Sequence, residues 1–225
     1  MNVLEALRTR QAVRAFRPDP VAPELLVALL DGAKHAPSGG NLQPWHVYVV
    51  TGAAKDALTA AAQAKLDRNE REEPDYEIYP RNLWEPLRSR RRDAGAQRYE
   101  AFGHTREMNG QAMLERANLG FFGAPVALFF CLDRRVGPPQ WADLGMYMQS
   151  LMLLAVSHGL ATCPQEVWAN WPDSVAAALG LSSGVMVFAG MSLGYADPDS
   201  PMNGYRTARA GIDAFTTFLS EPPED

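Results

Sequence analysis

Two arginines near the amino terminus have the spacing of an anion-binding pair. Arg10 and Arg14 flank Gln11, Ala12 and Val13, directly after a short helical pattern. Each guanidinium presents a rigid fork of N–H donors that matches the oxygens of a phosphate or a carboxylate. Arginines four residues apart are also typical of ordinary surface charge, so this pair alone leaves both interpretations open.

A polar loop at residues 36–45 reads Ala-Pro-Ser-Gly-Gly-Asn-Leu-Gln-Pro-Trp. Glycines, beginning with Gly39, let the backbone approach a ligand closely. Ser38, Asn41 and Gln43 carry neutral donors and acceptors that suit a polar ring or a polyol chain. A simple connecting loop is the alternative interpretation.

Two further segments could complete a site. Gly159 to Glu166 reads as a short strand that enters a turn, where backbone N–H groups could face a heterocycle. Asn203 to Arg209 is a second basic segment, in which Arg206 and Arg209 lie among polar neighbours.

Several other kinds of chemistry lack their motifs. The chain has no GxGxxG, GxxxxGK[ST] or HExxH motif. Its two cysteines, Cys131 and Cys163, form no metal-binding pattern. No two histidines have ligand spacing on one helix face; the four are His35, His46, His104 and His158. We therefore expect no metal site.

Composition predicts a globular protein. The 225 residues are 47% hydrophobic, and the net charge of −5 argues against a nucleic-acid binder. Leu144 to Gln165 spans 22 residues without Asp, Glu, Lys or Arg, yet it contains Gln, Ser, His and Pro. A helix buried in a core explains this run better than a membrane span. The sequence from Met1 to Arg14 has no apolar secretion signal, so we expect a soluble cytoplasmic protein.

The hydrophobic patterns predict alternating helices and strands. Pro23 suits the first turn of a helix, and Gly159 and Gly180 suit helix ends. The unbroken apolar run from Pro125 to Leu132 suits a central strand. Helices are predicted at 3–9, 23–33, 53–71, 140–159 and 172–179, strands at 46–51, 125–132 and 185–193, and a short amphipathic segment at 212–219. This pattern favours a three-layer α+β domain.

Residues 72–110 interrupt the pattern with tyrosines and an arginine-rich run. A helix is predicted at 86–102, with loops on both sides. We interpret this segment as a mobile insertion over a site; a solvated helix packed on the surface is an equal alternative.

Taken in order and spacing, these segments resemble the FMN-dependent nitroreductase family, and most closely its nitrobenzoate and nitroaromatic reductase branch. The Pro-Ser-Gly-Gly-Asn-Leu-Gln-Pro-Trp loop is the most specific element, and the resemblance extends from Leu4 to Phe218. It implies a single domain over residues 1–225, built as a dimeric α/β/α sandwich with a central mixed, mainly antiparallel sheet. It also implies FMN at the interface of a homodimer.

The resemblance assigns roles by position. Arg10 and Arg209 would hold the FMN phosphate with help from Arg206, and Arg14 would lie near the flavin N1–O2 edge. Pro37, Ser38 and Gly39 would come from the partner subunit. The cofactor-binding set implied is Arg10, Gln11, Ala12, Arg14, Pro37, Ser38, Gly39, Asn41, Pro164, Gln165, Glu166, Arg206 and Arg209. Many members have serine at the position of Ala12 and arginine or histidine at that of Gln11, and Asn118 is a further candidate ring contact.

The implied activity is an FMN-dependent NAD(P)H oxidoreductase that reduces nitroaromatic or quinone-like acceptors in a ping-pong cycle. Arg14 would stabilise the negative charge of the reduced flavin, and no protein nucleophile is needed. Relatives can also carry out reductive dehalogenation, flavin fragmentation or substrate oxidation, and a low-turnover FMN-binding protein is a third possibility. Met146, Met148, Met152 and Leu153 of the long helix could form a dimer surface, although ordinary core packing explains them as well.

Overall fold

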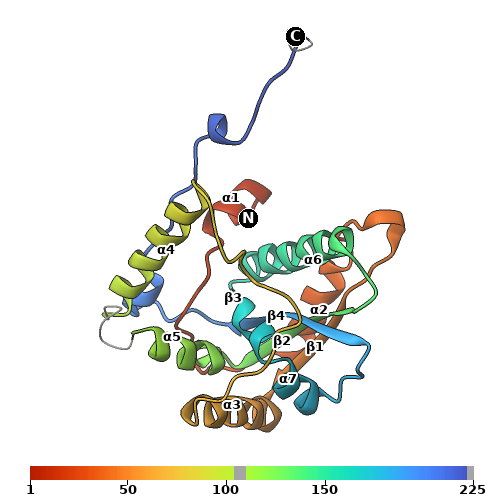
Figure 1. The fold of residues 1–225 in the computed structure, drawn as a ribbon, viewed down its shortest axis with the longest axis vertical. Coiled ribbons are helices and arrows are strands. Elements are labelled where there is room, and N and C mark those ends of the chain that lie inside the picture. Colours follow the sequence, from red (N-terminus) through yellow and green to blue (C-terminus); the bar gives the residue numbers. More distant parts are fainter. Residues whose placement is uncertain (104–109, 222–225) are drawn as a thin grey trace.

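A four-stranded antiparallel sheet forms the centre of the molecule (Figure 1). The computed structural model describes residues 1–103 and 110–221. The spatial order of the strands is β1-β2-β4-β3. Their bounds are β1 His46–Thr51, β2 Val126–Asp133, β3 Ala161–Gln165 and β4 Val185–Gly194. A parallel bridge between Ala12 and Thr162 joins this antiparallel sheet, which confirms the predicted mainly antiparallel arrangement.

Strand β2 shows why the sheet is covered on both faces. Its residues alternate between two cores: Leu128 and Phe130 pack with one layer of helices, and Phe129 and Cys131 pack with the other. Seven of its eight residues are buried, and this burial on both faces explains why the strand appears in the sequence as an unbroken apolar run. The predicted three-layer α+β architecture is confirmed.

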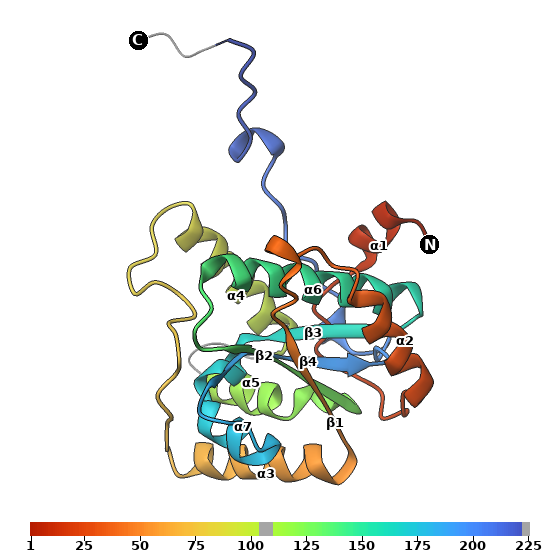
Figure 2. The same cartoon turned by 90° about the vertical axis from the view of Figure 1, so that its right-hand side faces the viewer.

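The helices form the two outer layers (Figure 2). On one side lie α2 and α6, with α1 packed beside α6. On the other side lie α3, α5 and α7. The bounds are α1 Val3–Thr9, α2 Pro23–Ala33, α3 Gly52–Asp67, α4 Leu87–Ala101, α5 Gly110–Leu119, α6 Pro138–Ser157 and α7 Pro172–Leu179.

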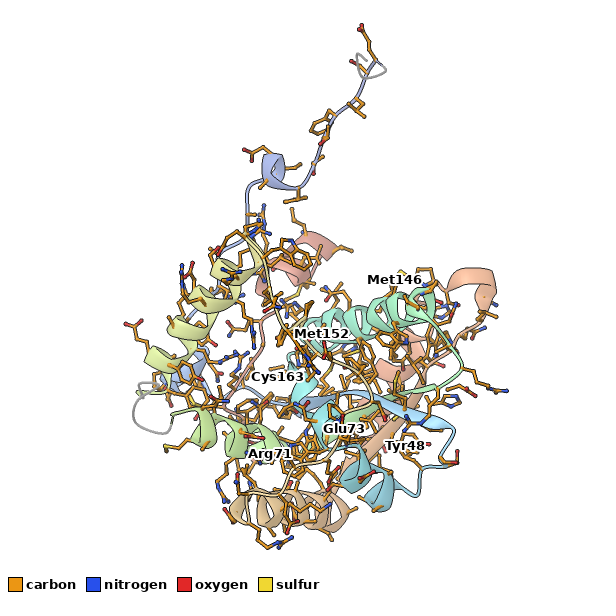
Figure 3. All side chains as sticks on the ribbon, viewed as in Figure 1. Tyr48, Arg71, Glu73, Met146, Met152 and Cys163 are labelled. Atoms are coloured by element: carbon orange, nitrogen blue, oxygen red, sulfur yellow. The ribbon has the colours of Figure 1, made fainter. Side chains whose placement is uncertain are left out.

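Helix α6 accounts for the charge-free run in the sequence. Leu144, Leu151 and Ala155 are fully buried against the sheet, and Met148 and Met152 are also mostly buried. The core interpretation therefore holds for those two methionines, whereas Met146 is exposed on the outward side of the helix (Figure 3). Within residues 1–103 and 110–221, no helix has the length and apolarity that a bilayer crossing requires.

Two elements differ from the sequence prediction. No element was predicted at 111–119, where most of helix α5 lies; its first residue is Gly110 and its buried residues are few. The segment at 212–219 contains only the 3₁₀ turn η6, Ile212–Ala214, and its apolar side chains are exposed, with Phe218 at 83%. Within one chain, this segment has no layer to pack against, and it extends away from the sheet (Figure 1).

The segment from residue 72 to α4 crosses the front of the molecule before the helix packs beside η5, Pro201–Asn203 (Figure 1). Its first part is anchored. Glu72 binds Lys65 at 2.7 Å and accepts the backbone N–H of Asp173 at 2.7 Å, which caps the start of α7. The predicted helix in this segment is confirmed as α4. The end of the predicted insertion and His104 lie outside the described residues.

Candidate functional site

The edge of strand β3 carries the amino-terminal arginine segment. Val13 donates its backbone N–H to the carbonyl of Thr162 at 3.0 Å, next to the parallel bridge of Ala12. Because β3 is the last strand of the sheet, its outer side is free to accept this pairing. The pairing brings Arg10 and Arg14 alongside β3, where the charges of both act on the pKa of Cys163.

Asn203 joins the carboxyl-terminal basic segment to the same edge. Its Oδ1 accepts the backbone N–H of Arg14 at 2.8 Å, and its Nδ2 donates to the carbonyls of Ala15 and Asp197, each at 2.9 Å. Its own carbonyl accepts from Gln11 Nε2 at 3.1 Å. Two segments almost 200 residues apart in the chain therefore form one surface.

Three arginines meet on this surface. Arg206 donates to the carbonyls of Arg8 and Thr9 at the end of α1, at 3.0 Å each. Burial and the nearby charges of Arg209 and Arg206 lower the pKa of Arg10. In residues 1–103 and 110–221, none of these three side chains forms an ion pair with a carboxylate. Like charges held together without an acidic partner form a site for an anion.

Arg14 is held by contacts other than those of Arg10, Arg206 and Arg209. Its Nη1 donates to the hydroxyl of Tyr205 at 2.7 Å and to the carbonyl of Ala12 at 3.2 Å. Its side chain lines an open pocket of about 460 Å³ whose other walls include Phe16 and Phe122. The guanidinium is thus a fixed cation beside an apolar wall.

The end of β3 carries a buried amide, and the turn that follows carries an exposed carboxylate. Gln165 is 2% exposed; its Nε2 donates to the carbonyl of Asn118 at 2.7 Å, and its Oε1 accepts from Ser192 at 2.8 Å. Its side chain points into the protein, so its backbone is the part that can line a site. Burial raises the pKa of the neighbouring Cys163 thiol to about 11, against the opposing charges of Arg14, Arg98 and Arg10. Figure 3 shows Cys163 on β3, between α6 and α5.

Glu166 is held by the segment that crosses the front. Tyr79 donates its hydroxyl proton to Glu166 Oε2 at 2.9 Å, and the guanidinium carbon of Arg91 lies 4.1 Å from the centre of the Tyr79 ring. Burial and then the charge of Glu166 raise the pKa of Tyr79. A protonated tyrosine therefore joins α4 to the turn after β3.

The polar loop at residues 36–45 lies at a different place in the fold from the arginine surface. Gly39 donates its N–H to Asp143 of α6 at 3.1 Å, and Ser38 Oγ accepts from the N–H of Gln43 at 3.0 Å. Gly40 and Asn41 have φ of 57° and 56°, the left-handed region that a glycine-rich turn favours. The loop, which contains Pro37, sits beyond the first turns of α6, apart from α1 and the arginines (Figure 1). One chain does not bring the loop and the arginines together.

Some residues of this surface were not predicted from the sequence. The sequence indicates Asn203 only as part of a basic segment, and Tyr79 and Arg91 only as members of a tyrosine- and arginine-rich region; Arg98 was not singled out. The spacing of seven residues between Arg91 and Arg98 places them on one helix face, which was the available signal.

Two other kinds of site receive no support. The described ranges contain no group of three or more His, Cys, Asp or Glu side chains arranged to hold a metal. Gly180-Leu181-Ser182-Ser183-Gly184 matches the GxSxG spacing of hydrolases. It connects α7 to β4, whereas the hydrolase motif needs a strand followed by a helix.

Comparison with known proteins gives the family. The family model described as "Nitroreductase family" matches residues 7–195. This chain belongs to the nitroreductase family. The match covers the arginine segment, the polar loop and all four strands of this family member.

Individual relatives extend over nearly the whole chain. Nitroreductase NfnB of Mycolicibacterium smegmatis is 40% identical over 220 residues, which cover 94% of this chain and 90% of the relative. The 4-nitrobenzoate reductase of Pseudomonas putida is 36% identical over 216 residues, 94% of this chain and 92% of the relative. The crystal structure of an FMN- and NADPH-dependent nitroreductase NfnB from sphigopyxis sp. strain HMH superposes with a TM-score of 0.95 at 43% identity, and the match covers 98% of this chain and 100% of that one. The sandwich fold expected from the sequence is thereby confirmed.

Proposed function

We propose that this chain is an FMN-dependent NAD(P)H oxidoreductase that reduces nitroaromatic compounds. The observation that carries the proposal is the meeting of Arg10, Arg206 and Arg209 at the edge of β3, with no acidic partner for any of them within the described part of the chain. The names of the relatives support the substrate class, because they include chloronitrobenzene, nitrobenzene and 4-nitrobenzoate reductases. A solved relative with TM-score 0.90 is described as FMN-dependent and in complex with NADPH.

The residues fit the cofactor by charge. A phosphate monoester needs several cationic donors, and Arg10, Arg206 and Arg209 would supply them, since no carboxylate of residues 1–103 or 110–221 is paired with them. Gln11 and Ala12 lie in the same segment, with Ala12 paired to β3. The peptide groups of Pro164, Gln165 and Glu166 would line the ring. When bound, FMN supplies the hydride chemistry.

Arg14 has an electrostatic role in this proposal. Its guanidinium is held by Tyr205 and by the carbonyl of Ala12, so it needs no reorganisation to stabilise negative charge nearby. Phe16 and Phe122 line the same pocket and give this cation an apolar neighbour. No protein nucleophile is required, in agreement with the absence of a hydrolase arrangement around Ser182.

A homodimer would complete the site. The loop residues Pro37, Ser38, Gly39 and Asn41 lie apart from the arginines of their own chain, so a second copy would bring them to the cofactor. Exposed apolar side chains support such an interface: Val3, Leu4 and Leu7 of α1, Met146 of α6, and Ile212, Phe215, Phe218 and Leu219 of the tail. We also propose that residues 1–225 form a single domain. The cytoplasm is the proposed location, supported by two buried cysteines that form no disulfide with each other.

Cofactor discrimination tests the phosphate site. FMN and riboflavin differ only in the phosphate, so Arg10→Gln should weaken FMN binding about tenfold and leave riboflavin binding almost unchanged. Arg81→Gln is the control, because it removes an arginine that is 87% exposed and paired with Glu77. Fluorescence titration of the stripped protein gives both dissociation constants. Equal binding of FMN and riboflavin by the unmodified protein would contradict the phosphate assignment.

A further inference from the structure

We infer that Arg98 of α4 binds the anionic group of an aromatic acid acceptor, and so determines specificity for acids over neutral nitroaromatics. This inference rests on the proposed function and deepens it. Arg98 lies on α4, about two turns after Arg91, and none of the roles assigned above uses it.

Arg98 has an unusual environment for an arginine of an exposed helix. Its Nε is buried, and it has no hydrogen-bond partner among the described residues. The guanidinium carbon lies 5.9 Å from the centre of the neighbouring Tyr99 ring, which supports one face of the group. A buried N–H without an acceptor is costly unless a ligand satisfies it.

The carboxylate of Glu166 is already engaged. Glu166 accepts the hydroxyl proton of Tyr79 at 2.9 Å, and Arg91 stacks on the other part of that tyrosine. Arg91 and Arg98 are seven residues apart, so they share one face of α4. The chain Arg91–Tyr79–Glu166 thus occupies the local carboxylate and leaves Arg98 for an external anion.

The position of Arg98 separates it from the phosphate arginines. The charges of Arg14, Arg98 and Arg10 all act on the pKa of Cys163, and of these three only the charge of Arg98 also acts on the pKa of Tyr79. The arginine charges that lower the pKa of Arg10 are those of Arg209 and Arg206. Arg98 therefore lies toward the Tyr79 end of the surface, where an acceptor carboxylate would be placed while Arg10 and its neighbours hold the cofactor.

The test compares a charged ligand with its neutral isostere. Benzoate and benzamide have the same shape, neither contains a nitro group to be reduced, and each is titrated into the FMN-loaded protein by calorimetry. Arg98→Gln should raise the dissociation constant of benzoate about tenfold, while benzamide changes by less than about twofold. Arg98→Lys should retain part of the affinity for benzoate, because it keeps the charge and loses the fork. Arg90→Gln is the matched control: it removes the same charge from an exposed position about a quarter turn round α4.

Several outcomes would overturn the inference. The first is that benzoate does not bind to the unmodified protein. The second is that Arg98→Gln weakens the binding of benzoate and benzamide equally, or that Arg90→Gln weakens the binding of benzoate as much as Arg98→Gln does. The third is that Arg98→Gln lowers the affinity for FMN, which would make Arg98 a cofactor ligand. A parallel assay of the reduction of 4-nitrobenzoate and nitrobenzene distinguishes a failure of the inference about Arg98 from a failure of the proposed function. If the unmodified protein reduces nitrobenzene and Arg98→Gln leaves the preference between the two acceptors unchanged, the inference fails and the proposed function stands. If the unmodified protein binds no FMN, the proposed function fails.

Discussion

Asn203 and Arg14 are joined by a hydrogen bond of 2.8 Å from the backbone N–H of Arg14 to Oδ1 of Asn203. This contact, with the bonds of Asn203 to Ala15, Asp197 and Gln11, fixes one basic segment against the other. The two segments have no regular structure that would hold them in register. The anion site therefore depends on one amide side chain that itself contacts no ligand in this account.

Replacement of Asn203 by alanine should weaken FMN binding about tenfold, because several backbone groups lose their partner and the arginines lose their register. Asn82→Ala is the control, since Asn82 is exposed and outside the surface. Fluorescence titration gives the affinity, and thermal unfolding of the apoprotein gives the loss of stability. Unchanged FMN affinity in Asn203→Ala would show that the segments align without this side chain.

Arg14→Ala should slow the reduction of bound FMN by NAD(P)H by about tenfold or more, because a preorganised cation beside the developing negative charge is lost. Arg14→Lys should recover part of the rate, since the charge remains. Glu70→Ala, which removes an exposed partner of Arg68, should leave the rate unchanged. Stopped-flow absorbance without oxygen measures this step, and equal rates for Arg14→Ala and Glu70→Ala would exclude the electrostatic role.

Glu72 should make the protein sensitive to acid. Burial alone would raise its pKa, but hydrogen bonds from Lys65 and Ser174 outweigh burial and hold the pKa below its ordinary value of 4.5. The folded-state pKa is therefore depressed, so this stabilisation is present above pH 4.5 and is lost as the pH falls through the folded-state value. Glu72→Gln should lower the free energy of unfolding at pH 7 by about 1–3 kcal/mol, and the difference from the unmodified protein should shrink in acid. Urea unfolding at several pH values measures this, with Glu77→Gln as the exposed control; a difference independent of pH would contradict the assignment.

Gly190 of β4 should not tolerate a side chain. A Cβ there would overlap Cδ1 of Trp168, and Trp168 is itself stacked on Phe121 with ring centres 4.9 Å apart. Gly190→Ala should destabilise the protein by about 1–3 kcal/mol and disturb the turn that precedes Trp168. Gly95→Ala in α4, where a Cβ meets nothing within 4 Å, should instead be neutral or stabilising. Chemical unfolding of both variants checks this, and equal stability of the two would remove the steric argument.

Elements with uniform environments were predictable from the sequence. Strand β2 is buried on both faces and therefore appears as an unbroken apolar run. Helix α7 begins at Pro172 and ends before Gly180, whose φ of 65° suits glycine, so both ends were visible. Helix α5 was missed because tertiary packing on α3, and not a strong apolar stripe, accounts for its stability.

The site was predictable where its residues form short motifs. Arg10, Arg14 and the loop at 37–41 were found in that way, and their roles toward FMN remain predictions. The contact between Tyr79 and Glu166 spans 87 residues, and the contacts of Asn203 with Gln11 and Arg14 span about 190. Contacts between residues so far apart in the chain produce no periodic pattern of residue types that a single sequence could show. Which arginine of α4 faces the site was equally hidden until the position of the helix was known.

The absorption spectrum of the purified protein tests the central claim most directly. The account predicts a flavin spectrum, release of FMN on denaturation, bleaching by NADH or NADPH in the absence of oxygen, and recovery of the colour when a nitroaromatic compound is added. A colourless protein that fails to take up added FMN would contradict the assignment of Arg10, Arg206 and Arg209 to its phosphate, and the proposed function with it.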